Sequence, residues 1–113
     1  MLFIESRVFT RRLEELAGAA AQDVLSQIQG DLLRNPMRGS LLQGLGGLRK
    51  ARCSNPAGSK GKRGGFRYFF LYLQYRNHIH LLLLLDKHKQ EDLTSEERKE
   101  LKAIVDAIKR EDK

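Results

Sequence analysis

Two long apolar runs joined by a short polar link constrain the fold of this chain more than any other feature. Residues 66–75, "FRYFFLYLQY", are rich in aromatic side chains, and residues 79–85, "IHLLLLL", contain five consecutive leucines. Strands of this composition are covered on both faces. The link "RNH" (76–78) is short enough for a tight turn between antiparallel strands. The two runs therefore predict a β-hairpin whose side chains are mostly core.

The segments before the hairpin show first a strand-like and then a helical pattern. Residues 2–5 predict a short opening strand. Apolar residues then recur at helical spacing to about residue 17 and again up to Leu32, with Ser6 as the N-cap of the first helix and "RNP" ending the second. Residues 37–47 are a Gly-rich connection. Residues 48–53, "LRKARC", predict a strand with Lys50 and Arg52 on one side and Arg49, Ala51 and Cys53 on the other.

The segment after the hairpin predicts one more helix. Thr94 and Glu97 match a capping box, and an apolar stripe follows at Leu101, Ile104, Val105 and Ile108. We therefore expect a single domain over residues 1–113 of the α+β class. It has an antiparallel β-sheet with two N-terminal helices and a C-terminal helix, in the order β-α-α-β-β-β-α, and its helices pack on one face of the sheet.

The positive charge of the chain is concentrated in its middle. The net charge is +7 and the pI is near 9.9. From Leu32 to Leu85 there are ten lysines and arginines and no Asp or Glu, whereas the rest of the chain carries a small acidic excess. Without local carboxylates to neutralise it, this segment favours a polyanionic partner such as nucleic acid over a solvated surface.

Several other kinds of protein fit the sequence poorly. Cys53 is the only cysteine, so no internal disulfide forms, and a small buried residue in a reducing cytoplasm is the expected role. We expect neither a signal peptide nor a membrane-spanning segment, because no apolar run in the sequence is long enough for either. His78 and His80 lack a third metal ligand, so we expect sheet residues near the hairpin turn and no metal site. Neither a phosphate-binding loop motif nor a nucleophile elbow is present.

Basic side chains from separate segments are predicted to converge on one face of the sheet. Lys50 and Arg52 point the same way, and Arg67 joins them if its strand pairs with theirs. Lys87 and His88 follow the Leu-rich strand at the same end of the sheet. We also expect contacts with the RNA backbone from four basic residues that lie near Lys50, Arg52 and Arg67 in the sequence. These are Arg49, Lys60, Lys62 and Arg63. The residues alone thus predict a concave, anion-binding sheet suited to a phosphodiester backbone.

The same residue types are able to support chemistry. RNA is cleaved without metal when its own 2′-hydroxyl attacks the adjacent phosphate. The protein must then accept one proton, donate another and stabilise the charged transition state. Arginine clamps a phosphate, lysine serves as base or stabiliser, and histidine suits the acid role.

The motifs "GGLRKAR", "GKRGGFRYFF" and "LLLLLDKHKQEDLTSEE", with a final helix, resemble the HigB branch of the RelE/ParE toxin superfamily over essentially the whole chain. The resemblance implies a compact α+β toxin that cleaves mRNA, in most members on translating ribosomes, without a metal or other cofactor. It also implies neutralisation by a cognate antitoxin, a small acidic or helix-turn-helix protein. Lys50, Arg52 and Arg67 match the family's basic positions, and Lys87 or His88 matches its further basic residue. In this chain the turn reads "LDKHKQ", where members of that branch usually have GKNE.

Two other function classes stay open at this point. A toxin of the same fold poisons DNA gyrase through protein contact, an activity that does not need a cluster of lysine and arginines. A non-catalytic RNA-binding or ribosome-associated protein would instead keep its affinity after Lys50→Ala or His88→Ala.

Overall fold

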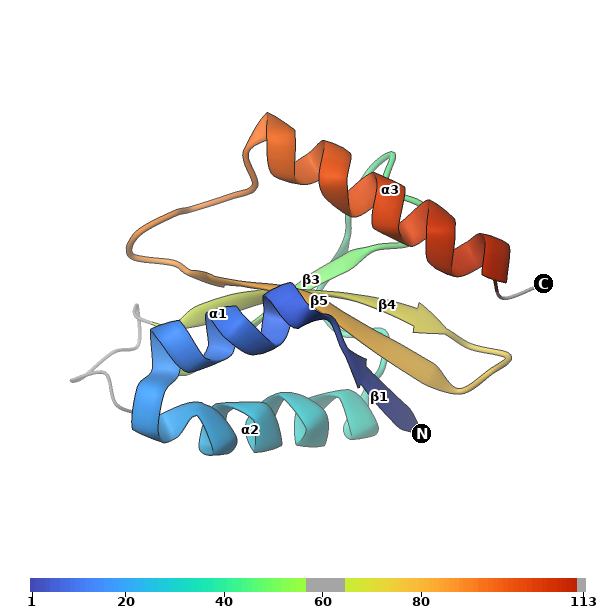
Figure 1. Cartoon of the computed structure of the whole chain (residues 1–113). Coiled ribbons are helices and arrows are strands. Elements are labelled where there is room, and N and C mark those ends of the chain that lie inside the picture. Colours follow the sequence, from blue (N-terminus) through green and yellow to red (C-terminus); the bar gives the residue numbers. More distant parts are fainter. Residues whose placement is uncertain (57–64, 112–113) are drawn as a thin grey trace.

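A five-stranded β-sheet forms the middle layer of the computed structural model, which describes residues 1–56 and 65–111 (Figure 1). The strand order is β1-β5-β4-β3-β2. The strands are β1 (Leu2–Glu5), β2 (Ser40–Leu41), β3 (Arg49–Cys53), β4 (Phe66–Leu73) and β5 (His78–Asp86). The predicted hairpin is confirmed as β4 and β5, which pair antiparallel at the centre of the sheet.

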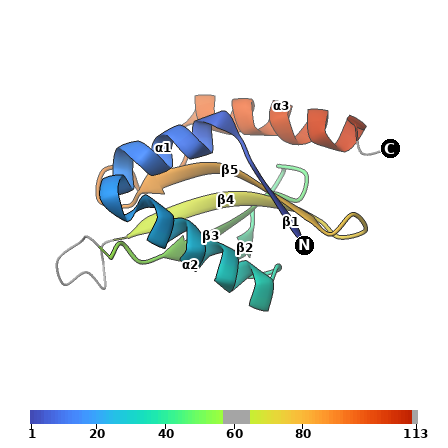
Figure 2. The same cartoon turned by 60° about the horizontal axis from the view of Figure 1, so that its bottom comes forward.

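Helices cover both faces of this sheet, and the expectation that they pack on one face was wrong. The helices are α1 (Arg7–Ala17), α2 (Ala21–Arg34) after a 3₁₀ turn (Gly18–Ala20), and α3 (Ser95–Glu111). Helices α1 and α2 lie on one face and α3 lies on the other (Figures 1 and 2). No helix within the described residues is long and apolar enough to cross a lipid bilayer.

The central strands explain why both faces are covered. Neighbouring side chains of a strand point to opposite faces, and both Leu84 and Leu85 of β5 are fully buried. Leu84 packs in the core under α1 and α2 with Phe9 and Ile28. Leu85 packs in the core under α3 with Leu101. A strand that is apolar on both faces leaves apolar surface in water unless each face has its own helix.

The predicted helix caps are confirmed. The Ser6 hydroxyl accepts a hydrogen bond from the Phe9 backbone N–H at 3.0 Å and donates one to the Leu82 carbonyl at 2.9 Å. The cap of α1 is thereby tied to β5. At α3, the Thr94 hydroxyl accepts from the Glu97 N–H at 3.1 Å, and the Glu97 carboxylate accepts from the Thr94 N–H at 2.9 Å. This reciprocal pair is a capping box.

Both edges of the sheet differ from the prediction. β1 pairs parallel with β5, from Leu2 opposite His78 to Glu5 opposite Leu81, so the sheet is mixed rather than wholly antiparallel. Parallel neighbours need a long crossover between them. Here the crossover is the part of the chain that runs from the end of β1 to the start of β5. At the other edge, the Gly-rich connection contains β2, which pairs antiparallel with β3. Gly39 (φ +78°) allows this approach, because a Cβ there would lie 1.9 Å from the Lys50 carbonyl oxygen.

Candidate anion-binding site

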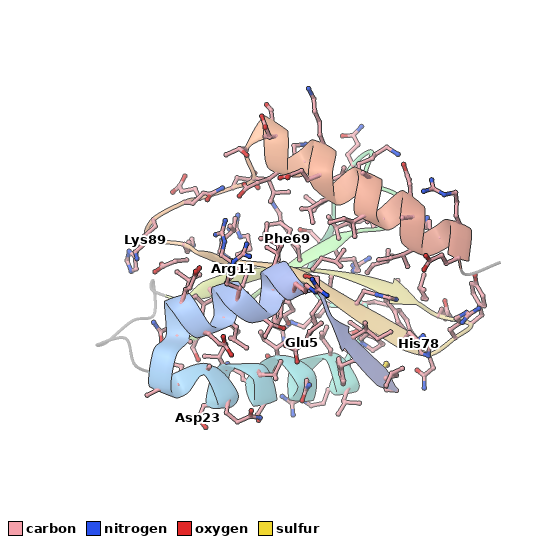
Figure 3. The ribbon with its side chains drawn as sticks, in the orientation of Figure 1. Glu5, Arg11, Asp23, Phe69, His78 and Lys89 are labelled. Atoms are coloured by element: carbon pink, nitrogen blue, oxygen red, sulfur yellow. The ribbon has the colours of Figure 1, made fainter. Side chains whose placement is uncertain are left out.

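Three of the predicted site residues meet on the α3 face of the sheet. Arg52 of β3 is directly opposite Arg67 of β4, and Lys50 is opposite Phe69 in the same pairing. Phe69 belongs to the core beneath α3 (Figure 3). Because side chains two residues apart in a strand share a face, Lys50, Arg52 and Arg67 all project on that side. We call these three residues the basic cluster.

The basic cluster opens onto a pocket of about 430 Å³. One wall is formed by β3 and β4 and the other by the segment that leads into β2. The lining residues are Arg38, Gly39, Ser40, Lys50, Ala51, Arg52 and Arg67. Ser40 is directly opposite Lys50 in the β2–β3 pairing, so the two side chains share a face of the sheet. The polar side chains that line the pocket are therefore all cationic except for the hydroxyl group of Ser40.

Arg38 lines this pocket and was not among the predicted site residues. Its guanidinium contacts the Asp31 carboxylate of α2 at 3.1 Å and donates to the Arg52 carbonyl at 3.3 Å. Its Nε atom is buried and has no hydrogen-bond partner among the described residues. Arg38 lies in the stretch from Leu32 to Leu85 that has no Asp or Glu, but only the pairing of β2 with β3 places it at the site.

Arg49 is separated from the basic cluster. It is opposite Phe70, whose ring lies in the core under α1 and α2. Its guanidinium donates to the carbonyls of Arg38 and Gly39, at 3.2 and 3.4 Å. In this structure Arg49 therefore ties β3 to the segment before β2 and faces away from the pocket.

The other predicted contacts lie outside the pocket or outside the described residues. Lys87 and His88 follow β5 directly, and neither lines the pocket. The Lys87 N–H donates to the Gly65 carbonyl at 3.2 Å, so the strand pairing extends one residue beyond β5. His88 is exposed, and its N–H donates to the Asp86 carboxylate at 2.9 Å. The remaining three residues, Lys60, Lys62 and Arg63, lie outside the described residues.

The connection between β5 and α3 reaches the basic cluster through two acidic residues that the sequence did not single out. Arg67 donates to the Glu91 carbonyl at 2.6 Å. The Asp92 carboxylate is 4.0 Å from the Lys50 ammonium group, at the outer limit of an ion pair. Within residues 1–56 and 65–111, Arg52 has no partner for its exposed guanidinium. Two of the three cations thus already contact an oxygen of the same chain.

Two titratable groups lie beneath the opposite face and take no part in the pocket. Cys53 is buried, as predicted, and burial raises the pKa of its thiol to about 12, with the Asp31 charge adding to the rise. Burial likewise raises the pKa of the Tyr68 phenol. Its hydroxyl has no hydrogen-bond partner among the described residues. Both groups therefore stay protonated at neutral pH.

The two β5 histidines lie away from the basic cluster. His78 and His80 are half-buried near the hairpin, as predicted, and line a separate pocket with Ile108 of α3. Figure 3 shows His78 and Lys89 at opposite ends of the sheet. Within the described parts of the chain, no three His, Cys, Asp or Glu side chains are placed to hold a metal ion.

Comparison with solved structures places this architecture in a known fold class. No protein-family model matches the chain. A double arginine-to-alanine mutant of the E. coli toxin RelE in the free state superimposes with a TM-score of 0.57 and 11% identity, over 80% of this chain and 86% of that one. The isolated E. coli RelE toxin gives 0.56 and 11%, over 96% of each chain. The intact E. coli RelBE toxin–antitoxin complex gives 0.54 and 11%, over 74% of this chain and 92% of that one. The chain therefore has the RelE-like fold.

Proposed function

We propose that this protein is the toxin of a type II toxin–antitoxin system, a cytoplasmic endoribonuclease that cleaves mRNA without a metal cofactor, on translating ribosomes. The observation that carries the proposal is the pairing of Arg52 with Arg67, with Lys50 on the same face of the sheet. Three cations from adjacent strands converge on one open pocket. The RelE-like fold and the motif resemblance point the same way.

The proposed reaction uses the substrate's own 2′-hydroxyl as the nucleophile. Arg52 and Arg67 hold the scissile phosphate and stabilise the charge that develops on it, because guanidinium groups pair with phosphate oxygens in two places. Lys50 lies beside this pair, either as a further stabiliser in its ammonium form or, as the neutral amine, as the group that receives the 2′-hydroxyl proton. The leaving 5′-oxygen needs a proton donor, and His88 is chemically the more suitable of the two basic residues after β5. The products are a 2′,3′-cyclic phosphate and a 5′-hydroxyl end.

The proposed partners are mRNA, the ribosome and an antitoxin. Support for the antitoxin comes from the RelE-like fold, since one structure of this fold is a toxin–antitoxin complex. Support for a nucleic-acid partner comes from the charge of the chain. The stretch from Leu32 to Leu85, which has no Asp or Glu, carries ten lysines and arginines, and three of them form the basic cluster.

The test is inducible expression of the wild type beside Arg67→Ala, with mapping of mRNA 5′ ends in arrested cells. The control is Arg110→Ala, which removes the same charge from an exposed position on α3, remote from the pocket lining. We expect cuts within translated frames for the wild type and the control, and a loss of about 10²- to 10³-fold in cleavage for Arg67→Ala.

Other outcomes identify the competing functions. Arrest with intact mRNA and broken or over-supercoiled DNA would indicate a gyrase poison and overturn the proposal. Binding of RNA without any cleavage, equal for wild type and Arg67→Ala, would indicate a non-catalytic RNA-binding protein. An equal loss of cleavage in Arg67→Ala and Arg110→Ala would show that Arg67 has no special role in the reaction.

A further inference from the structure

The connection from β5 to α3 contacts two of the three cations of the basic cluster. It leaves the sheet at the end of β5 and turns back to reach the start of α3 (Figure 1). On this path Glu91 accepts through its backbone carbonyl from Arg67, and Asp92 faces Lys50 through its carboxylate. The oxygens of both residues therefore lie where oxygens of a bound phosphate would meet the same donors.

The connection is held in this position at both of its ends. At the β5 end, the Lys89 and Gln90 N–H groups donate to the Asp86 carbonyl, at 3.0 and 2.9 Å. At the α3 end, the Gln90 side-chain amide donates to the Asp92 carbonyl at 2.8 Å and to the Glu97 carboxylate at 2.7 Å. Glu97 is also the capping-box residue of α3. The segment at residues 91–92 is thus a short bridge between two fixed points.

The ion pair between this bridge and the basic cluster is weak enough to exchange, and the 2.6 Å hydrogen bond from Arg67 to the Glu91 carbonyl is replaced by one to a charged phosphate oxygen. The side chains of Lys50 and Asp92 are 28% and 57% exposed, and their separation is 4.0 Å. A partly exposed ion pair at this separation contributes little to stability because water and salt screen it. Asp92 and Glu91 are both exposed to solvent, so moving them uncovers no apolar core. A ligand with several negative charges gains more from the cluster than the bridge does.

We propose that Glu91 and Asp92 form an acidic strap that occupies Arg67 and Lys50 in the free protein and is displaced by a phosphodiester chain. The proposal rests on the proposed function for the identity of the natural ligand. Among the described residues, Arg52 alone of the three cluster cations has no competing oxygen. A single phosphate therefore meets one open cation, whereas a chain engages Arg52 and then competes for both neighbours at once. The strap therefore makes the pocket selective for polymeric phosphate over free phosphate.

The first test compares Asp92→Asn with Glu91→Gln in the full chain. Both changes remove one negative charge, but only Asp92 contacts the cluster through its side chain. Asn keeps the oxygen that accepts from the Leu93 N–H at 2.8 Å, so the local turn is preserved. The probes are a fluorescent single-stranded RNA with 2′-O-methyl groups, which cannot be cleaved, and inorganic polyphosphate. We expect Asp92→Asn to bind both about two- to fivefold more tightly than wild type, and Glu91→Gln to stay close to wild type.

The outcomes separate this proposal from the proposed function. Equal gains in the two variants would show a general charge effect and overturn the strap, as would unchanged or weaker binding by Asp92→Asn. Polyphosphate binding tests the strap even if the wild type cleaves no RNA. As a second measurement, hydrogen exchange of residues 87–93 should rise several-fold when the RNA probe saturates the wild type. Unchanged exchange there would show that the strap stays in place and overturn its displacement.

Discussion

Arg52 and Arg67 lie directly opposite each other on adjacent antiparallel strands. Like charges in this arrangement destabilise a sheet, and only Arg67 has an acceptor, the Glu91 carbonyl, among the described residues. A bound phosphate between the two guanidinium groups would relieve the repulsion. The pair is thus unfavourable for the free fold and favourable for an anion complex, which is expected of binding residues rather than structural ones.

The first prediction is that Arg52→Gln separates stability from activity. Removing one charge of the pair should leave the free energy of unfolding unchanged or raise it by about 0.2–1 kcal/mol. RNA cleavage should fall about 10²-fold, because a transition-state contact is lost. Urea unfolding and single-turnover cleavage measure the two effects. Arg52→Lys, the control, should restore the wild-type stability while recovering only part of the activity, since lysine does not pair with phosphate in two places. A large loss of stability in Arg52→Gln would contradict the prediction.

The second prediction concerns salt. If all three cations of the basic cluster contact phosphates, the logarithm of the RNA association constant should fall with the logarithm of salt concentration with a slope of about −2. Between about 50 and 200 mM salt this is a loss of about 20-fold. Arg52→Gln should make the slope shallower by about 0.7, because one contact disappears. Fluorescence anisotropy with uncleavable RNA measures both slopes. A wild-type slope near zero would mean that the cluster does not bind backbone phosphates.

The elements that the sequence predicted well are those determined by neighbouring residues. The N-cap at Ser6 and the capping box of Thr94 with Glu97 depend on spacings of three residues, and both form as expected. The β4–β5 hairpin is similarly local. The parallel pairing of β1 with β5 joins residues more than 70 positions apart. No local pattern in "LFIE" distinguishes a parallel neighbour from an antiparallel one, so this pairing could not be predicted.

The same distinction applies to the site. Strand alternation alone put Lys50 and Arg52 on one face, and the structure agrees. Adding Arg38 required the pairing of β2 with β3, which depends on the close approach at Gly39. The path of the connection between β5 and α3, and hence the contact of Asp92 with Lys50, depends on where α3 packs. Because α3 covers the second face of the sheet, a prediction with all helices on one face could not have found it.

The third prediction is that Ser6→Ala destabilises the fold more than an ordinary helix cap would. The Ser6 hydroxyl both accepts from the first turn of α1 and donates to the Leu82 carbonyl of β5. Losing the cap alone costs about 1 kcal/mol, and the unpaired carbonyl adds about 1 kcal/mol. Ser26→Ala, an exposed change within α2, serves as the control and should be nearly neutral. A loss of only about 1 kcal/mol for Ser6→Ala would show that the contact with β5 contributes nothing beyond the cap.

The fourth prediction is that Cys53 is unreactive in the folded protein. The thiolate is the reactive form, and the raised pKa leaves almost none of it at neutral pH. Alkylation by iodoacetamide should therefore proceed much more slowly than for a free cysteine and accelerate when urea unfolds the chain. Mass spectrometry follows the reaction. Alkylation at the free-cysteine rate in native buffer would contradict the buried position.

The last prediction follows from the same thiol and concerns alkaline stability. The Cys53 pKa rises from its ordinary value of 9.0 to about 12 on folding, because burial disfavours the thiolate. A group whose pKa is raised by folding gives its full contribution to stability below the unfolded value, and this contribution is lost as pH rises towards the folded value. The window is therefore pH 9 to 12.

Cys53→Ala removes this contribution without removing the other groups that titrate at high pH. At neutral pH the variant should be less stable than wild type by about 1–2 kcal/mol, through lost packing. Above about pH 9 the wild type alone loses the thiol contribution, so the difference between the two should shrink. Urea unfolding at about pH 7 and about pH 10.5 measures that difference. A constant difference would show that the thiol is as exposed to water in the folded chain as in the unfolded one.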